Sequence, residues 1–169
     1  MKTKKVKGFT LVELIVVIAI IGVLAAILVP SMLGYVKKSK VSSANSAANS
    51  VQKAINTALI ELDEEGKDVG AINTVTGSGS GISNVSAWEA GDNASFFTKI
   101  KNYMDDMDGL NFQAACEGGV CKAVAVAVDS TYTGTYPGGC ITVDNYKSYS
   151  GASKLGDALT LAKAKAGMC

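Results

Sequence analysis

The sequence predicts an α+β protein in which one long N-terminal helix carries a small antiparallel β-sheet domain. Three observations predict this fold. Residues 9–33 form an apolar run with a single carboxylate, apolar residues then recur at helical spacing as far as Leu62, and the last third holds short alternating segments between glycine-rich turns. The 169 residues suffice for one ordinary domain and an appendage.

The apolar run predicts a membrane-spanning helix that is kept in the protein. Such a helix needs about 20 apolar residues, whereas a secretory signal peptide has an apolar core of about 7–15. Four lysines in the first eight residues favour a cytoplasmic N-terminus and an exported C-terminal part. Three lysines between residues 37 and 40 follow the run and weaken this bias.

Glu13 is the one charged residue inside the apolar run, and two interpretations of it are open. Near the positive end of the helix dipole and near the membrane interface, a carboxylate is tolerated at little cost. Alternatively, an intramembrane carboxylate awaits a positive partner. No basic residue lies at helical spacing inside the run, so the nearest candidate is the α-amine that a cut before Phe9 would create.

The stretch "KGFTLVELIVVIAIIGVLAAILVP" resembles the N-terminus of type IV pilin precursors. The shared features are a short basic leader ending in Gly8, then Phe9, Glu13 five residues into the new N-terminus, a long apolar helix and Pro30. The rest of the chain matches only in general layout. The resemblance implies the ladle-like pilin fold, with a cleaved leader (1–8), a transmembrane and filament-core helix (9–36), an amphipathic helix (37–66), an αβ-loop with a short helix (67–110), and an antiparallel sheet with a disulfide-bonded C-terminal region (111–169).

The resemblance also implies roles for individual residues. A prepilin peptidase would cut between Gly8 and Phe9 on the cytoplasmic side, and Phe9 would then be N-methylated. Glu13 would pair with the Phe9 amine of a neighbouring subunit in the filament, and the stretch between Gly22 and Pro30 would be able to unwind there. Without assembly, Gly22 simply allows close helix packing and Pro30 kinks the helix.

After the apolar run the helical pattern continues with one apolar stripe. Its members recur at steps of three and four: Val41, Ala44, Ala48, Val51, Ile55, Ala58 and Leu62. This spacing predicts an amphipathic helix packed on a sheet, and Gly66 is expected to end it.

The middle of the chain predicts little regular structure. Residues 67–93 contain "TGSGSGIS", which predicts a linker or surface loop. Its glycines do not fit G-x-G-x-x-G, so a phosphate loop is not expected. Residues 95–107 predict a short helix with one apolar face: Phe96, Ile100, Tyr103 and Met107. Residues 105–109 are acidic but lack the full spacing of a calcium loop, and we expect no metal there.

Three strands are predicted in the C-terminal third. "LNFQAAC" and "CKAVAVAVD" flank a glycine turn and are expected to pair antiparallel, and "GGCITVDNY" is the expected third strand. In the second strand valines alternate with alanines. We expect the alanine face to lie on the long helix and the valine face under loops or neighbouring molecules. The tail predicts a terminal helix, with Leu155, Ala158, Leu159 and Ala162 at helical spacing.

The four cysteines are Cys116, Cys121, Cys140 and Cys169. An even number behind an export signal favours disulfides. A zinc site is the alternative, and the wide separation of Cys140 from Cys169 disfavours it. We favour the pairs Cys116–Cys121 and Cys140–Cys169, with Cys116–Cys140 and Cys121–Cys169 as the second choice.

Composition excludes several functions. The chain has no histidine, and it shows no nucleophile motif, so we expect no enzymatic activity and no cofactor. All 16 basic residues are lysine; beyond residue 8, 12 lysines face 15 acidic residues, a net charge of −3. Specific nucleic-acid binding is therefore not predicted.

The sequence thus predicts a structural subunit, the major pilin, that self-assembles into a type IV pilus for adhesion, motility or aggregation. Its expected partners are further copies, the prepilin peptidase, the assembly machinery and, before assembly, the cytoplasmic membrane. The precursor would lie there with its head outside, and the filament on a bacterial surface. The alternatives are a pseudopilin of a type II secretion or competence (DNA uptake) system, a membrane-tethered enzyme, and a plain anchor with a binding head.

Overall fold

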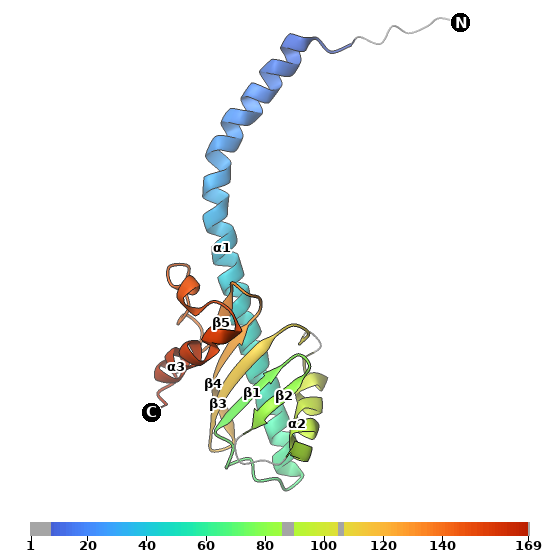
Figure 1. Cartoon of the computed structure of the whole chain (residues 1–169), viewed down its shortest axis with the longest axis vertical. Helices are drawn as coiled ribbons and strands as arrows, with labels where there is room; N and C mark the ends of the chain where they lie inside the picture. Colours follow the sequence, from blue (N-terminus) through green and yellow to red (C-terminus); the bar gives the residue numbers. More distant parts are fainter. Residues whose placement is uncertain (1–7, 86–89, 105–106, 169) are drawn as a thin grey trace, which may run out of the picture. The chain divides into compact units, whose positions relative to one another are not determined.

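The computed structural model describes residues 8–85, 90–104 and 107–168 (Figure 1). The chain divides into two compact units, Met1–Lys37 and Lys38–Cys169. One helix, α1 (Leu11–Glu64), contributes residues to both units.

The part of α1 in the first unit is apolar on every side. Each large apolar side chain between residues 9 and 36 is at least 45 % exposed. An 18-residue window has a mean hydropathy of 3.1, so by length and composition this helix could cross a membrane. Pro30 lies inside the helix and does not end it.

The second unit is built around a five-stranded antiparallel sheet with the strand order β2-β1-β3-β4-β5. Its strands are β1 (Thr74–Ser78), β2 (Gly81–Val85), β3 (Asn111–Glu117), β4 (Val120–Ala127) and β5 (Thr133–Tyr136). Gly118 and Gly119 both have positive φ and form the tight turn between β3 and β4. The predicted α+β fold, a long helix packed on a small antiparallel sheet, is confirmed.

The sheet is covered on both faces. The predicted apolar stripe of α1 is buried, and from Ala48 to Leu62 it packs against one face together with α2 (Ala90–Asn102). The opposite face carries α3 (Leu155–Lys165), the predicted terminal helix. Two short 3₁₀ helices, η1 (Tyr146–Tyr149) and η2 (Ala152–Lys154), precede α3.

The predicted assignment of the two faces of β4 was wrong. Val124 and Val126 pack in the core formed with α1, whereas the alanines pack in the core formed with α3. Alanines allow the short helix α3 to lie close to the strands, while the valines interlock with larger side chains of α1 such as Ile55 and Leu59. Alternation predicts which residues share a face, but not which helix covers that face.

The segment predicted as a linker, residues 67–93, contains the hairpin of β1 and β2 and the start of α2. At two positions only glycine fits, because atoms of residues distant in the sequence lie too close for a side chain. A Cβ at Gly77 would overlap the ring of Phe112, and one at Gly79 would overlap the carbonyl oxygen of Met107. The glycines that suggest flexibility therefore allow close packing in the folded chain.

The third predicted strand was misplaced. Pairing with β4 involves Thr133–Tyr136; residues 138–145 are irregular, and Tyr146 begins η1. Gly134 lies against the backbone of α1, because a Cβ there would overlap the carbonyl oxygen of Ala44. Ile141, which lies inside the segment predicted as a strand, is instead a buried residue of this irregular segment and packs in the core with α3.

The ends of the helices were predicted with mixed success. α1 ends at Glu64; Gly66 has φ +79° and the Lys67 N–H donates to the Leu62 carbonyl at 3.0 Å, so the predicted stop is confirmed. α2 begins at Ala90 and ends at Asn102, earlier at both ends than predicted. Tyr103 is 50 % exposed and follows the helix.

Candidate functional site

The start of α1 is closed by a reciprocal cap between Thr10 and Glu13. The Glu13 carboxylate oxygen Oε2 accepts from the Thr10 backbone N–H at 2.8 Å and from its hydroxyl at 2.6 Å, and the Glu13 N–H donates to the Thr10 hydroxyl at 3.3 Å. This is the capping box T-x-x-E. Glu13 therefore has a structural role in its own helix, which the sequence interpretation missed although the motif is local.

The cap leaves part of the Glu13 carboxylate available. Both hydrogen bonds use Oε2, and Oε1 has no partner among the described residues. The carboxylate is exposed at the end of the apolar helix, and no described lysine pairs with it. An external cation could reach Oε1 without breaking the cap.

The other residues predicted for processing and assembly lie along the first unit. Gly8 and Phe9 precede α1, and Phe9 is 79 % exposed. Gly22 and Pro30 are inside α1, and a Cβ at Gly8 or Gly22 would meet no atom within 4 Å. Glu13, Gly22 and Pro30 are therefore all open to contact from outside the chain.

Cys116 and Cys121 face each other across the β3–β4 turn. They are direct Cα partners, and the Cys116 N–H donates to the Asn73 carbonyl on the side away from β4. The pair thus sits at a non-hydrogen-bonded position, where the two strands are closest. A hydrogen bond with Cys116 and burial raise the pKa of the Cys121 thiol. Both cysteines are free thiols in this structure.

Cys140 lies apart from this pair. Its sulfur is 3.3 Å from the Pro137 carbonyl oxygen and 3.8 Å from that of Leu161 on α3. Cys169, its predicted partner, lies outside the described residues. The described residues contain no group of three or more His, Cys, Asp or Glu side chains arranged to hold a metal ion. Asp105 and Asp106 of the acidic segment lie outside the described residues.

Amide side chains of α1 bind the outer backbone groups of two strands. Asn56 accepts from the Cys121 N–H at 2.7 Å, and Asn56 and Gln52 donate to its carbonyl at 3.3 and 3.0 Å. Asn45 accepts from the Thr135 N–H at 2.9 Å. The polar positions beside the apolar stripe therefore fix the register of helix against sheet.

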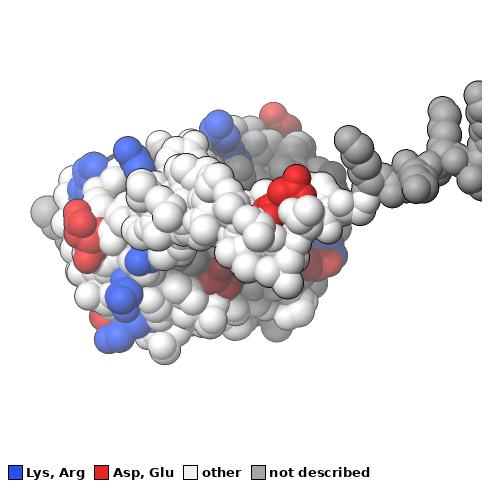
Figure 2. All heavy atoms as spheres, turned by 90° about the horizontal axis from the view of Figure 1, so that it is seen from above, with Lys and Arg blue, Asp and Glu red and all other residues white. Residues whose placement is uncertain are grey.

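A charged cluster joins α2 to the C-terminal end of α1. Lys99 pairs with Glu61 at 3.2 Å and Glu65 at 2.7 Å, and the Tyr103 hydroxyl donates to Glu61. The hydrogen bond from Tyr103, followed by that from Lys99, lowers the pKa of Glu61. The Glu65 and Glu61 carboxylates raise the pKa of Lys99. The visible face in Figure 2 has lysines and acids interspersed and no continuous basic patch.

Comparison with known proteins bears on the N-terminal segment. Residues 3–29 match the family model described as "Prokaryotic N-terminal methylation motif". The "Type IV major fimbrial protein FimA" of Dichelobacter nodosus is 48% identical over 62 residues, 37% of this chain and 39% of that protein. The resemblance to type IV pilins is confirmed.

Two further pilin relatives are similar over the same limited extent. A "Fimbrial protein" of Pseudomonas aeruginosa is 43% identical over 61 residues, 36% of this chain and 40% of that protein. The "Type IV major alpha-pilin" of Moraxella bovis is 46% identical over 55 residues, 32% of this chain and 35% of that protein. The chain thus matches less than half the length of these pilins, and no solved structure matches it significantly.

Proposed function

We propose that the chain is the precursor of a pilin, a structural subunit that self-assembles into a type IV pilus filament and has no enzymatic activity. The observation that carries this proposal is the apolar helix of residues 11–36. Its side chains are exposed on all sides, and it starts within a methylation motif. An apolar helix without a covering in its own chain must be covered by lipid or by other copies.

The processing step would supply a partner for Glu13. Cleavage between Gly8 and Phe9 creates an α-amine at Phe9, which N-methylation leaves positively charged. The Oε1 atom of Glu13 has no described partner and is free to accept this amine from a neighbouring subunit. In a dry filament core the pair would neutralise both charges and select one register, because an unpaired charge there is costly.

On this proposal, the protein would occupy two environments in turn: the membrane and then the filament. The precursor would sit in the cytoplasmic membrane with its N-terminus inside and its head outside, where the prepilin peptidase and the assembly machinery act on it. The mature subunit would then join an extracellular filament that serves adhesion, motility or aggregation. The relatives named above are fimbrial proteins and a pilin, which supports a surface filament.

Electron microscopy of sheared cell-surface material, with mass spectrometry of its subunit, tests the proposal. We expect long filaments whose subunit begins with N-methylated Phe9. A subunit that begins at Met1 or Lys2 would contradict it and indicate a plain anchor. Short structures confined to the cell envelope would support a pseudopilin of a type II secretion or competence system.

We further propose a disulfide between Cys116 and Cys121, supported by their direct pairing, and one between Cys140 and Cys169. The first closes a short loop and would stabilise the head by about 2 kcal/mol. Peptide mapping without reduction tests both pairs. Met168, the residue before Cys169, lines one cavity with Cys116, so a fragment linking Cys116 to Cys169 is the most informative contrary result.

A further inference from the structure

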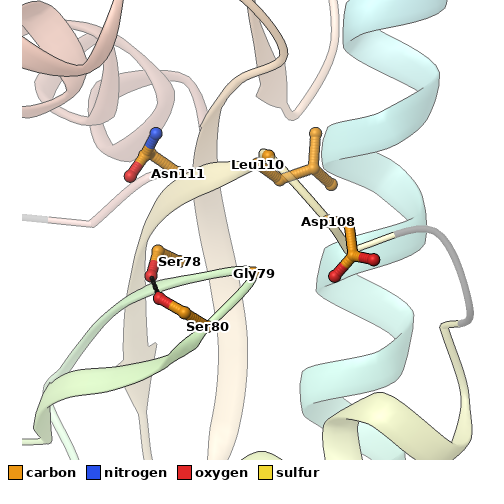
Figure 3. A pocket seen from close by; sticks show the side chains of 7 residues that line it. Ser78, Gly79, Ser80, Asp108, Leu110 and Asn111 are labelled. Carbon is orange, nitrogen blue, oxygen red and sulfur yellow. Dashed lines mark hydrogen bonds between the residues drawn. The ribbon is translucent and has the colours of Figure 1, made fainter.

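Two adjoining hollows form a polar trough at the end of the sheet where β3 begins. The first, of about 350 Å³, is lined by residues 78–80 and 108–111 (Figure 3). The second, of about 440 Å³, is lined mainly by residues 129–130 and 150–153. Both include Gly109 and Asn111, so the hollows adjoin at these two residues. Each is of a size typical of ligand pockets.

The walls of the polar trough are fixed by close backbone approaches. The Gly79 N–H donates to the Leu110 carbonyl at 2.9 Å, and a Cβ at Gly79 would overlap the Met107 carbonyl oxygen. Gly151, with φ +76°, lets its loop come close to Ser130, whose carbonyl oxygen would lie 3.3 Å from an added Cβ. The loops are therefore held in place before any ligand arrives, which lowers the entropy cost of binding.

The trough offers hydrogen-bonding groups that the chain does not use. The Asn111 side chain and the Asp108 carboxylate are exposed, and neither hydrogen-bonds to another described residue. Asp129 uses Oδ1 to accept from the N–H groups of Thr131 and Tyr132, and Oδ2 has no described partner. Ser78 and Ser80 bond each other at 2.9 Å, which leaves one hydroxyl proton for a ligand.

The charges and shapes of the lining narrow the class of ligand. The lining contains two carboxylates and no lysine, which disfavours phosphates, nucleic acids and sulfated polymers. It has amide, hydroxyl and carboxylate groups and no large apolar pocket for a side-chain anchor, which disfavours a hydrophobic peptide. A ligand with many neutral hydroxyl groups satisfies these groups best.

We propose that the polar trough binds a neutral saccharide chain that lies along both hollows, with Asn111 at the centre. Asn111 donates and accepts through its amide, and the Asp108 and Asp129 carboxylates accept from sugar hydroxyls. The lining has no aromatic ring, so hydrogen bonds carry the recognition and one head binds weakly. Every residue of the trough belongs to the second unit, so saccharide binding can be measured on the single chain without filaments.

An array of immobilised neutral, sialylated and sulfated oligosaccharides, probed with the full chain in detergent micelles, tests this proposal. We expect retention on neutral oligosaccharides and less on the anionic ones. Asn111→Ala and Asp108→Ala should each weaken binding about tenfold, the loss of one hydrogen bond. The matched controls Asn102→Ala and Asp144→Ala change exposed side chains outside the trough and should bind like the parent chain.

Circular dichroism of each variant establishes that it is folded before it is applied to the array. Three outcomes overturn the proposal: no neutral oligosaccharide is retained, only anionic ones are retained, or the controls lose binding as much as Asn111→Ala. None of these outcomes bears on whether filaments form, which microscopy of sheared material measures separately.

Discussion

The two halves of α1 are both helical, but they differ in the burial of their apolar side chains. In residues 11–36 every large apolar side chain is exposed, whereas in residues 38–64 one apolar stripe is buried against the sheet. The second half packs on the sheet of its own unit, whereas the apolar side chains of the first half are exposed within the part of the chain that the structure describes. A helix whose apolar surface is left uncovered by its own chain is expected to be covered from outside, and this expectation underlies the proposed function.

The largest expected effect is on Glu13 and separates its two roles. Glu13→Gln keeps a side chain able to close the capping box but removes the charge, and Glu13→Leu removes both. If the charge pairs with a neighbour's amine, both variants remain in the membrane and yield no sheared filament. The matched control is Glu64→Gln, which makes the same change at an exposed position at the other end of α1. This variant should assemble normally. Wild-type amounts of filament from Glu13→Gln would leave Glu13 with only its capping role.

Two glycines give the next contrast. A methyl group at Gly134 overlaps the carbonyl oxygen of Ala44, and neither backbone can move away without breaking the helix or the sheet. Gly134→Ala should lower the free energy of unfolding of the head by about 3 kcal/mol or more. Gly22→Ala meets open space and should favour the helix by about 1 kcal/mol. Urea denaturation in micelles measures both; equal effects would mean that the contact at Gly134 is wrong.

A matched pair of isoleucines tests the burial of the stripe directly. Ile55 is fully buried and Ile20 is 56 % exposed. Ile55→Ala should cost about 2–5 kcal/mol of head stability, because it removes packed atoms and leaves a cavity. Ile20→Ala should leave the urea midpoint of the head unchanged. A large shift for Ile20→Ala would contradict the exposure of its side chain.

The smallest expected effect is on how the stability of the head depends on pH in the acid range. The pKa of Glu61 is lowered in the folded head by hydrogen bonds from Tyr103 and then Lys99. The resulting stability is present above the unfolded pKa of the carboxyl group and is lost as the pH falls through the folded value. Stability in Glu61→Gln should therefore fall less steeply with acid than in the parent chain, measured by thermal unfolding from neutral pH downward. Identical slopes would mean that the cluster is too well solvated to contribute.

Local sequence patterns predicted the helices, but they did not predict which distant segments pack against each element. The stripe from Val41 to Leu62 was predictable because its period is set by the helix itself. The faces of β4 were assigned wrongly because alternation says nothing about distant partners. The hairpin at Gly77 and Gly79 was missed for a related reason: its glycines are required by Phe112 and Met107, far along the chain.

The sequence predicted which residue is central to the candidate site, but it did not predict the geometry around that residue. Glu13 was singled out because a charge in an apolar run is costly. Its cap could also have been found, since Thr10 stands three residues before it. The free Oε1 atom could not, because only coordinates show which carboxylate oxygen the cap uses. The polar trough was not predicted either, since it joins segments that are adjacent only after folding.

The amides of α1 that bind β4 and β5 have a consequence for molecules kept at high density. A strand with unpaired backbone groups can recruit a strand from another molecule and start edge-to-edge aggregation. The N–H and carbonyl of Cys121 and the N–H of Thr135 are already taken by Asn56, Gln52 and Asn45. When many copies of the head are close together, these backbone groups therefore offer no hydrogen-bonding template for a strand of another molecule.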